Sequence, residues 1–293
     1  MPAKEANASI TLSAIIPVGG FPNGDATLKS WVLNELPRGL EVILVVDSDE
    51  ESVKKSIQEI AQSVNGNVKV LLSQHRNPGS TREIGLRACR GTWVCFWDAD
   101  DLPEVTNVWS NVDNSAHQEA DIIVGNFRSL DVETKTEVEH LHGTSDRLMN
   151  VYLNPGLWRF VFKTKLLEDM LFPGLTMGED QVFLFRSITK SREIEFVNDF
   201  FYNYYVYSSG QLTKSTNISV DLMKARDLCK EIYVAEKNNY LLSAIFKQDL
   251  TLIKRGKLSI KFNTICDLIN LSSRSINNLR TLFGVISKVY YDK

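Results

Sequence analysis

The sequence lacks the features that mark several classes of protein. None of its uninterrupted apolar runs approaches the ~18 residues that a membrane-spanning helix needs. Residues 1–9 are charged or small and contain no apolar stretch, so we expect no secretory signal peptide. The four cysteines are scattered without a C-x-x-C pair, which predicts reduced thiols and a cytoplasmic protein. A net charge of −3 provides no basic footprint for nucleic acid, which we exclude as a partner.

The first half of the chain alternates short apolar runs with segments of helical spacing. The predicted strands are 11–18, 41–46, 68–72 and 93–97, and the predicted helices are 27–36, 50–64 and 81–89. Because these strands are apolar on both faces, we predict an α/β fold with a mostly parallel sheet covered by helices on both sides.

The second half is more mixed. It reads as a strand at 121–127, an exposed hairpin at 131–139, a mixed aromatic-rich segment at 155–172, a helix at 181–188 and a strand at 195–207. From about residue 219 onward only helical patterns remain.

The C-terminal segment differs from the rest in charge. Residues 247–293 hold nine Lys or Arg and three Asp or Glu. Their apolar residues have amphipathic helical spacing, at Phe262, Ile265, Cys266 and Ile269 and again at Leu279, Leu282, Phe283, Ile286 and Val289. Two interpretations stay open: the apolar stripe packs on the domain, or a basic face contacts an anionic membrane surface.

Four polar clusters follow the four predicted strands of the first half. They are Pro17, Val18, Gly19 and Gly20; Asp47; Asn77, Pro78, Gly79 and Ser80, leading to Arg82; and Asp98, Ala99, Asp100 and Asp101. In an open parallel sheet, ligands bind beyond the carboxyl ends of the strands. We therefore expect these clusters to form one site.

The cluster at residues 98–101 carries three carboxylates within four residues. They repel one another unless a cation neutralises them, and Mg²⁺ and Mn²⁺ are held by one or two carboxylates plus phosphates. Asp98 and Asp100 would share a face on extended chain. The alternative is a helix N-cap with acidic first-turn residues, which would account for Asp101 but not for Asp98.

A second acidic site, Glu179 and Asp180, opens a predicted helix. The helix dipole favours an ionised carboxylate there, and such a group in a cleft can accept a proton from an attacking hydroxyl. Simple helix capping is the alternative.

Taken together, these motifs resemble glycosyltransferase family 2, which has the GT-A fold. The resemblance rests on residues 12–17, 41–47 and 77–91, the following W-V-C-F-W-D-A-D-D, and M-G-E-D-Q-V-F, and covers roughly residues 11–214. It implies a catalytic domain at 1–214, with a nucleotide-sugar half at 11–110 and an acceptor half at 111–214. A helical, basic extension would follow at 215–293.

The resemblance also implies roles for individual residues. Pro17 and Val18 would contact the base and Asp47 the nucleoside, with Gly19, Asn77, Gly79, Arg82, Asp98 and Ala99 completing the nucleotide-sugar site. Asp100 would ligate Mn²⁺ or Mg²⁺, with Asp98 and Asp101 beside it. Asp180 would be the base of an inverting displacement from a UDP-sugar, with Glu179 orienting the acceptor or the base.

Two departures from the family pattern bear on these roles. The second strand ends in Asp47-Ser48-Asp49-Glu50 rather than two acids followed by Gly-Ser, which leaves open which carboxylate contacts the nucleoside. The Q-x-x-R-W signature of processive synthases is absent, which favours single additions to a glycan or lipid-linked glycan.

Two rival functions remain. A sugar-nucleotide nucleotidyltransferase would be expected to have a basic first loop, which residues 19–24 lack. A catalytically inactive nucleotide-sugar-binding scaffold is the other.

Several further residues have competing interpretations. His140 and His142 could face a metal or lie in a polar loop. Trp158, Arg159, Phe160 and the tyrosines at 202–207 could stack on sugar rings or pack in the core. Ser208, Ser209 and Thr213 could border the diphosphate or form a turn.

Overall fold

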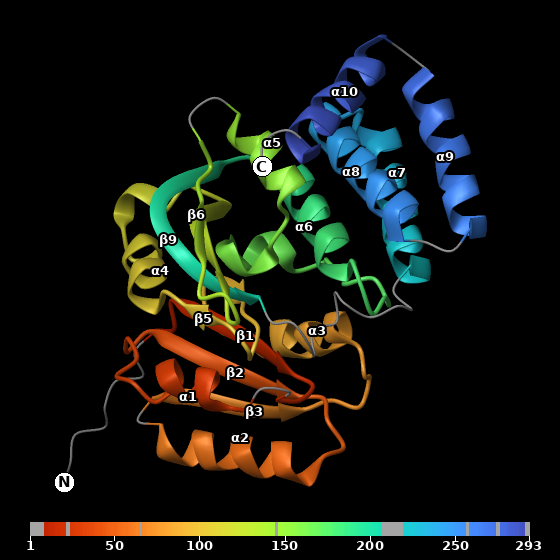
Figure 1. Ribbon diagram of the computed structural model, residues 1–293. Helices are drawn as coiled ribbons and strands as arrows, with labels where there is room; N and C mark the ends of the chain where they lie inside the picture. Colours follow the sequence, from red (N-terminus) through yellow and green to blue (C-terminus); the bar gives the residue numbers. More distant parts are fainter. Residues whose placement is uncertain are drawn as a thin grey trace, which may run out of the picture. The chain divides into compact units, whose positions relative to one another are not determined.

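The computed structural model describes residues 9–21, 24–64, 66–143, 146–206, 219–255, 258–273 and 276–290. They form two compact units that interleave along the chain (Figure 1). The first unit comprises Met1–Leu141, Leu157–Gly174 and Lys190–Gln211, and the second comprises His142–Gly156, Leu175–Thr189 and Leu212–Lys293. The expected domain boundaries at residues 110 and 214 stay predictions.

One mixed sheet runs through the first unit. Its strands are β1 (Leu12–Val18), β2 (Leu40–Val46), β3 (Asn67–Leu72), β4 (Trp93–Phe96), β5 (Leu102–Pro103), β6 (Ile122–Asp131), β7 (Glu137–His140), β8 (Phe160–Lys163) and β9 (Ile194–Val206). The spatial order is β3-β2-β1-β4-β8-β6-β9-β5, with β7 paired to β6. β1 to β4 are mutually parallel, as the sequence predicts, and β9 is parallel to β6.

Helices of the first unit pack on the sheet. They are α1 (Ala26–Val32), α2 (Glu51–Ser63), α3 (Pro78–Ala88) and α4 (Val105–Val112), with 3₁₀ turns η1 (Ser115–His117), η2 (Leu157–Arg159) and η3 (Thr164–Leu167). Alternate residues of a strand point to opposite faces. Ala14 and Ile16 of β1 belong to the core cluster that includes α1 and α2, whereas Ile15 lies against Gly85 of α3. The two faces of β1 are therefore covered by different helices.

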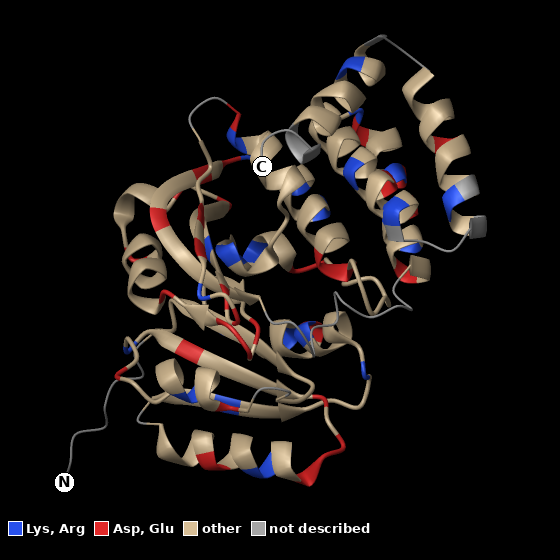
Figure 2. Ribbon diagram, in the orientation of Figure 1, with Lys and Arg blue, Asp and Glu red and all other residues tan. Residues whose placement is uncertain are grey.

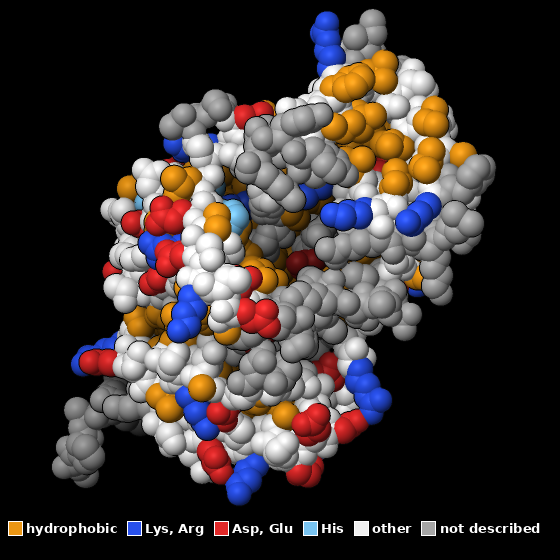
Figure 3. Space-filling model, viewed as in Figure 1, with side chains coloured by type: hydrophobic (Ala, Val, Ile, Leu, Met, Phe, Trp, Pro, Cys, Tyr) orange, Lys and Arg blue, Asp and Glu red, His pale blue; other side chains and the backbone are white. Residues whose placement is uncertain are grey.

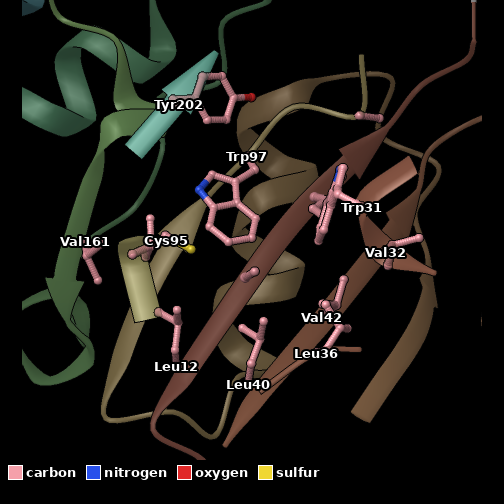
Figure 4. Packing of buried hydrophobic residues seen from close by; sticks show 14 of the residues in the cluster. Leu12, Trp31, Val32, Leu36, Leu40, Val42, Cys95, Trp97, Val161 and Tyr202 are labelled. Atoms are coloured by element: carbon pink, nitrogen blue, oxygen red, sulfur yellow. The ribbon is translucent and has the colours of Figure 1, made fainter. Parts of the chain in front are cut away.

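The core on the α1 side is built from aliphatic strand residues and two indoles. Trp31 of α1 meets Trp97, just after β4, edge to face, with ring centroids 5.4 Å apart (Figure 4). Leu12, Leu40 and Val42 of the strands are buried in the same cluster. This packing fixes the position of the chain where it leaves β4.

Two strands differ from the expectation. β3 was expected to be buried, but it lies at the sheet edge with alternating exposed positions, and Leu72 is 70% exposed. β8 inserts beside β4 in the antiparallel direction. The sequence did not predict this insertion, because a four-residue apolar strand carries no signal of its direction.

The second unit is helical in its described residues. Its helices are α5 (Arg147–Leu153), α6 (Glu179–Lys190), α7 (Ser219–Glu236), α8 (Asn239–Arg255), α9 (Leu258–Ser273) and α10 (Ile276–Tyr290). α8 contacts α5, α7, α9 and α10, and its Leu241, Leu242, Ile245 and Phe246 are fully buried. Across the described helices, none is both long and apolar enough to cross a membrane.

Candidate active site

The carboxyl ends of the parallel strands meet at one edge of the sheet. In register, Val18 of β1 lies opposite Val46 of β2, and Val46 lies opposite Leu72 of β3. The backbone continues this alignment beyond the strands, since Asp47 N donates to Val18 O at 2.9 Å. Trp97 N donates to Ile15 O at 3.0 Å, which aligns the end of β4 with β1. The polar clusters predicted at these ends therefore lie along a single edge.

The loop after β1 leaves space beside its backbone. A Cβ built on Gly19 or on Gly20 would meet no atom within 4 Å. Val18 is fully buried and Pro17 is half-buried, so the side chains anchor the strand end while the following backbone stays accessible. A planar ligand could approach this backbone closely.

Asp47 joins the end of β2 to the start of α3. Its Oδ2 accepts hydrogen bonds from Thr81 Oγ1 at 2.7 Å and from Asn77 N at 3.1 Å. Burial alone would raise the pKa of this carboxyl, but hydrogen bonds, led by that from Thr81, outweigh burial and hold the pKa below its ordinary value. The buried Oδ1 has no hydrogen-bond partner among the described residues. It is an acceptor of this carboxyl that no described residue satisfies.

Asp49, the second carboxylate of the variant motif, lies elsewhere. It pairs with Arg76, and both side chains are more than 70% exposed. Of the two acids, the structure therefore favours Asp47 as the one that could contact a bound nucleoside.

The start of α3 is organised by its own side chains. Asn77 is the N-cap, and its Oδ1 accepts from Ser80 N at 3.0 Å. Pro78 occupies the first turn and Gly79 is buried. A Cβ on Gly85, one turn beyond Thr81, would lie 2.4 Å from Ile15 Cγ2. The absence of a side chain there lets α3 approach the sheet closely.

Arg82 connects α3 to the end of β4. Its Nη2 donates to Asp98 Oδ1 at 2.8 Å, and the side chains are 9% and 30% exposed. The guanidinium therefore places a buried positive charge beside the acidic cluster. A cation in this position can stabilise the negative charge of a phosphate.

β9 also binds the acidic loop, residues 98–101. The Tyr202 hydroxyl accepts a hydrogen bond from Asp98 N at 2.9 Å, and Asp101 Oδ1 accepts one from Tyr205 N at 2.7 Å. Asp101 is 1% exposed. The capping alternative for Asp101 is wrong, because α4 begins later, with Glu104 in the N-cap position, and Asp101 binds the β9 backbone instead.

The acidic cluster is electrostatically strained. Burial, then the neighbouring charge of Asp98, raises the pKa of Asp100 to about 6. Burial, then the charges of Asp100 and Asp98, raises the pKa of Asp101 well above its ordinary value. A bound cation would relieve this repulsion. Within the described ranges, no group of three or more His, Cys, Asp or Glu side chains is arranged to hold a metal.

Aromatic rings are stacked next to this loop. The Trp158 indole lies parallel to the rings of Tyr202 and Tyr204, with centroid distances of 4.6 and 5.7 Å. Tyr202 is buried, whereas Trp158 and Tyr204 are half-buried. His140 stacks on Phe127 at 4.2 Å. Core packing thus accounts for Tyr202 and His140, while the partly exposed rings could also contact a sugar.

Glu179 and Asp180 lie in the second unit, in the first turn of α6. Gly178 precedes them with a φ of +82°, and Val182 N donates back to Gly178 O at 3.2 Å. Asp180 is half-buried and its Oδ1 accepts from Gln181 N at 2.8 Å, whereas Glu179 is 5% exposed. The helix therefore starts two residues before the predicted residue 181, and both carboxylates sit at its positive end.

A hollow in the second unit adjoins this helix start. Its lining includes Tyr152, Gln181, Leu222, Lys247 and Gln248. Gln248 Nε2 donates to Gln181 Oε1 at 2.9 Å. Gln181, the residue after Asp180, thus borders a partly polar surface depression.

The sequence predicts the acids of the first unit but not Thr81 and Tyr205, which donate hydrogen bonds to Asp47 and Asp101. Thr81 and Tyr205 carry no catalytic signature, and their contacts depend on the separation of α3 from β2 and of β9 from β4. Only the clustering of tyrosines at 202–207 hinted at a role. Ser208, Ser209 and Thr213 lie outside the described residues.

Comparisons with solved structures support the fold. The structure is similar to S. aureus TarS residues 1–349 in a crystal structure with UDP-GlcNAc, with a TM-score of 0.69 and 16% identity over 97% of this chain and 93% of that one. It is also similar to the mannosyltransferase PcManGT from Pyrobaculum calidifontis in complex with GDP-Man and Mn²⁺ (TM-score 0.54, 14% identity, 96% and 87% covered). The predicted GT-A fold with helical C-terminal region is confirmed.

The sequence comparisons agree. The chain is 23% identical over 198 residues to the cholesterol galactosyltransferase of Borreliella burgdorferi. This match covers 61% of this chain and 55% of the relative. It spans about half or less of the length of the curated relatives it matches. The family model described as Glycosyl transferase family 2 matches residues 25–188, more than half of the 293 residues. The chain therefore belongs to glycosyl transferase family 2.

Proposed function

We propose that this protein transfers a sugar from a nucleoside diphosphate donor, a UDP-sugar, to a hydroxyl of a glycan or lipid-linked glycan, with inversion at the anomeric carbon. The observation that carries the proposal is the Arg82–Asp98 pair, at the sheet edge where Asp47 binds Thr81, the neighbour of Arg82, and where Asp100 follows Asp98. This arrangement offers an acceptor for a nucleoside, a cation for phosphate and carboxylates for a metal. The TarS relative, crystallised with UDP-GlcNAc, supports the choice of donor.

In this proposal the nucleoside lies along the β1 and β2 ends. The available Oδ1 of Asp47 would accept a hydrogen bond from the base or ribose, and the open backbone at Gly19 would face the ring, anchored by Pro17 and Val18. Asn77, Gly79 and Ala99 would border the donor, because they lie in the loops on either side of Arg82.

The carboxylates fit a divalent metal, Mn²⁺ or Mg²⁺, which takes one or two carboxylates and completes its coordination with phosphate and water. We propose Asp100 as the principal ligand, because it follows the strand end beside Asp98, and a cation there would offset the repulsion that, after burial, contributes to raising the pKa of Asp100 to about 6. Asp98, which accepts a hydrogen bond from Arg82, and Asp101, which accepts one from Tyr205 N, would lie beside it. When bound, the ion would offset the negative charge developing on the departing diphosphate.

Arg82 would contribute to the same task through its buried charge. Because Tyr202 holds the backbone of Asp98 and the Asp98 carboxylate holds the Arg82 guanidinium, the charge would be in place before the donor arrives. Such preorganisation is the main way in which fixed charges accelerate reactions.

We propose Asp180 as the base that removes the acceptor proton, with Glu179 orienting the acceptor or the base. The position of both at the start of α6 supports this, because the helix dipole stabilises the ionised carboxylate. The hollow next to Gln181 supports it further, since an acceptor could reach the helix start there. In an inverting displacement, one base suffices as the new bond forms.

The acceptor is proposed to be presented at a membrane. Residues 247–293 carry a net positive charge and would bring the enzyme to the anionic cytoplasmic membrane face. Deleting them should lower binding to anionic vesicles.

The test is release of UDP from a panel of nucleotide-sugars, with Mn²⁺, Mg²⁺ or EDTA, with and without glycan acceptors. Wild type is compared with Asp100→Asn and Asp180→Asn. We expect metal-dependent release from one donor, loss of release in Asp100→Asn, and loss of acceptor-stimulated release in Asp180→Asn with donor binding kept. NMR of the product would give the anomeric configuration.

Two outcomes of the same assay refute the proposal. Donor binding without turnover across a broad acceptor panel would favour the scaffold. Pyrophosphate release from a nucleoside triphosphate and a sugar phosphate would favour the nucleotidyltransferase.

A further inference from the structure

Helices α9 and α10 carry apolar side chains on their outer sides. Ile265 and Ile269 of α9 are 41% and 61% exposed, and Leu279 and Phe283 of α10 are 39% and 67% exposed. Each pair is spaced i, i+4, so its members lie on one face of their helix. Figure 3 shows hydrophobic side chains gathered over these two helices.

The inner sides of the same helices are also apolar. Ile260, Leu271 and Val285 are less than 10% exposed, and α9 and α10 contact each other and α8. Core packing therefore does not require the four outer side chains. Single exposed apolar residues such as Leu72 and Val234 are ordinary, but two adjacent helices that each expose a pair indicate a contact surface.

The net charge of this region is positive. The sequence of residues 258–290 contains four Lys or Arg and a single acid, Asp267. Figure 2 shows the charged side chains of the described residues on these helices. Asp267 Oδ2 accepts from Arg226 at 2.7 Å and from Lys230 at 3.1 Å, both on α7, so its charge is compensated within the unit. Arg280, next to Leu279, is exposed. The outer side thus combines apolar groups with positive charge.

We propose that Ile265, Ile269, Leu279 and Phe283 form a membrane-contact face that inserts into the headgroup region of an anionic bilayer. The helices would lie in the plane of the interface, with Arg280 at the lipid phosphates. This deepens the membrane contact of the proposed function by adding apolar insertion to charge attraction. It does not depend on the transfer reaction.

The first test is co-sedimentation of the full chain with vesicles of phosphatidylglycerol and phosphatidylcholine, or of phosphatidylcholine alone. The variant is Ile269→Ser with Phe283→Ser. The matched control is Leu72→Ser with Val234→Ser, which removes two apolar side chains of similar exposure, 70% and 57%, outside the face. We expect the variant to lose at least about tenfold in partitioning to anionic vesicles, and the control to stay near wild type.

Cys266 provides a second measurement. It is exposed between Ile265 and Ile269, while Cys95 and Cys229 are buried and Cys89 is half-buried. A polarity-sensitive fluorophore on Cys266 should shift its emission to shorter wavelength when anionic vesicles are added. Co-sedimentation without such a shift would place the contact elsewhere and overturn the proposal.

Three other results would also overturn it. The first is equal vesicle binding by variant and wild type, and the second is no binding by wild type. The third is a dimer in sedimentation velocity that the Ile269 and Phe283 substitutions dissociate, without vesicle binding, which would make the face an interface between two copies. Absence of UDP release together with intact vesicle binding would refute only the reaction.

Discussion

The coupling free energy between Arg82 and Asp98 should be larger than that of an ion pair on the protein surface. The N–O distance of this pair is 2.8 Å, and the side chains are 9% and 30% exposed. A charge-assisted hydrogen bond contributes about 1.5–3 kcal/mol. Because Asp98 is partly solvated, we expect a coupling in the lower part of this range, about 1.5–2 kcal/mol, in a double-mutant cycle with Arg82→Met and Asp98→Asn.

A control pair of equal length separates burial from distance. Lys54 and Glu51 on α2 are also 2.8 Å apart, but their side chains are 33% and 86% exposed. Their cycle, Lys54→Met with Glu51→Gln, should give a coupling near zero, because water screens the charges. The two ion pairs thus have the same contact distance but differ in the burial of their side chains.

Unfolding can be followed in the relevant unit alone. All five tryptophans lie in the first unit, so the free energy of its unfolding in urea can be measured by their fluorescence. Each single substitution should also raise the Kd for UDP about tenfold, or ~1.4 kcal/mol. A coupling for Arg82 and Asp98 below about 0.5 kcal/mol, or equal to the control, would refute the claim that the pair organises the site.

Three further results are expected. Gly85→Val should lower the free energy of unfolding by about 1–3 kcal/mol, because a Cβ alone would lie 2.4 Å from a β1 side chain. Gly284→Ala in α10, where a Cβ would have open space, should raise the free energy of unfolding by about 0.5–1 kcal/mol. Thermal unfolding that shifts in the same direction for both variants would contradict this. Tyr202→Phe removes the hydroxyl that accepts from Asp98 N–H, so it should lower the free energy of unfolding by about 1–3 kcal/mol and slow sugar transfer. Tyr233→Phe is the control and should change neither. An unchanged melting temperature of Tyr202→Phe would argue against the contact. EDTA should abolish UDP release and added Mn²⁺ should restore it, and full activity in EDTA would refute the metal proposal.

The parallel half of the sheet could be predicted because each of its strands carries its own signal. β1, β2 and β4 are apolar on both faces and are followed at once by polar or glycine-rich turns. Since parallel strands end at the same edge, the meeting of Asp47, Arg82 and Asp98 followed from the pattern. β3 was misjudged as buried because its Val68 and Val70 resemble a core strand, and edge position depends on pairing partners that the local sequence does not contain.

The remaining features depend on tertiary contacts. The binding of Asp101 to Tyr205 N joins residues 104 positions apart, and no spacing rule connects them. The C-terminal segment is helical, as its spacing predicts, but the interpretation in which the apolar stripe packs on the domain is wrong for Ile265, Ile269, Leu279 and Phe283, which are exposed. The buried apolar residues among those described in α9 and α10 are Ile260, Leu271 and Val285, which lie outside the predicted stripe. An amphipathic pattern specifies a face and not what covers it.

A crystal structure of the chain grown with UDP and Mn²⁺ tests the central claim most directly. We predict the nucleoside beside Asp47 and Gly19, the diphosphate near Arg82, and the cation on Asp100. Nucleotide bound away from the carboxyl ends of β1, β2 and β4, or a cation held by residues other than the acidic cluster, would contradict the account.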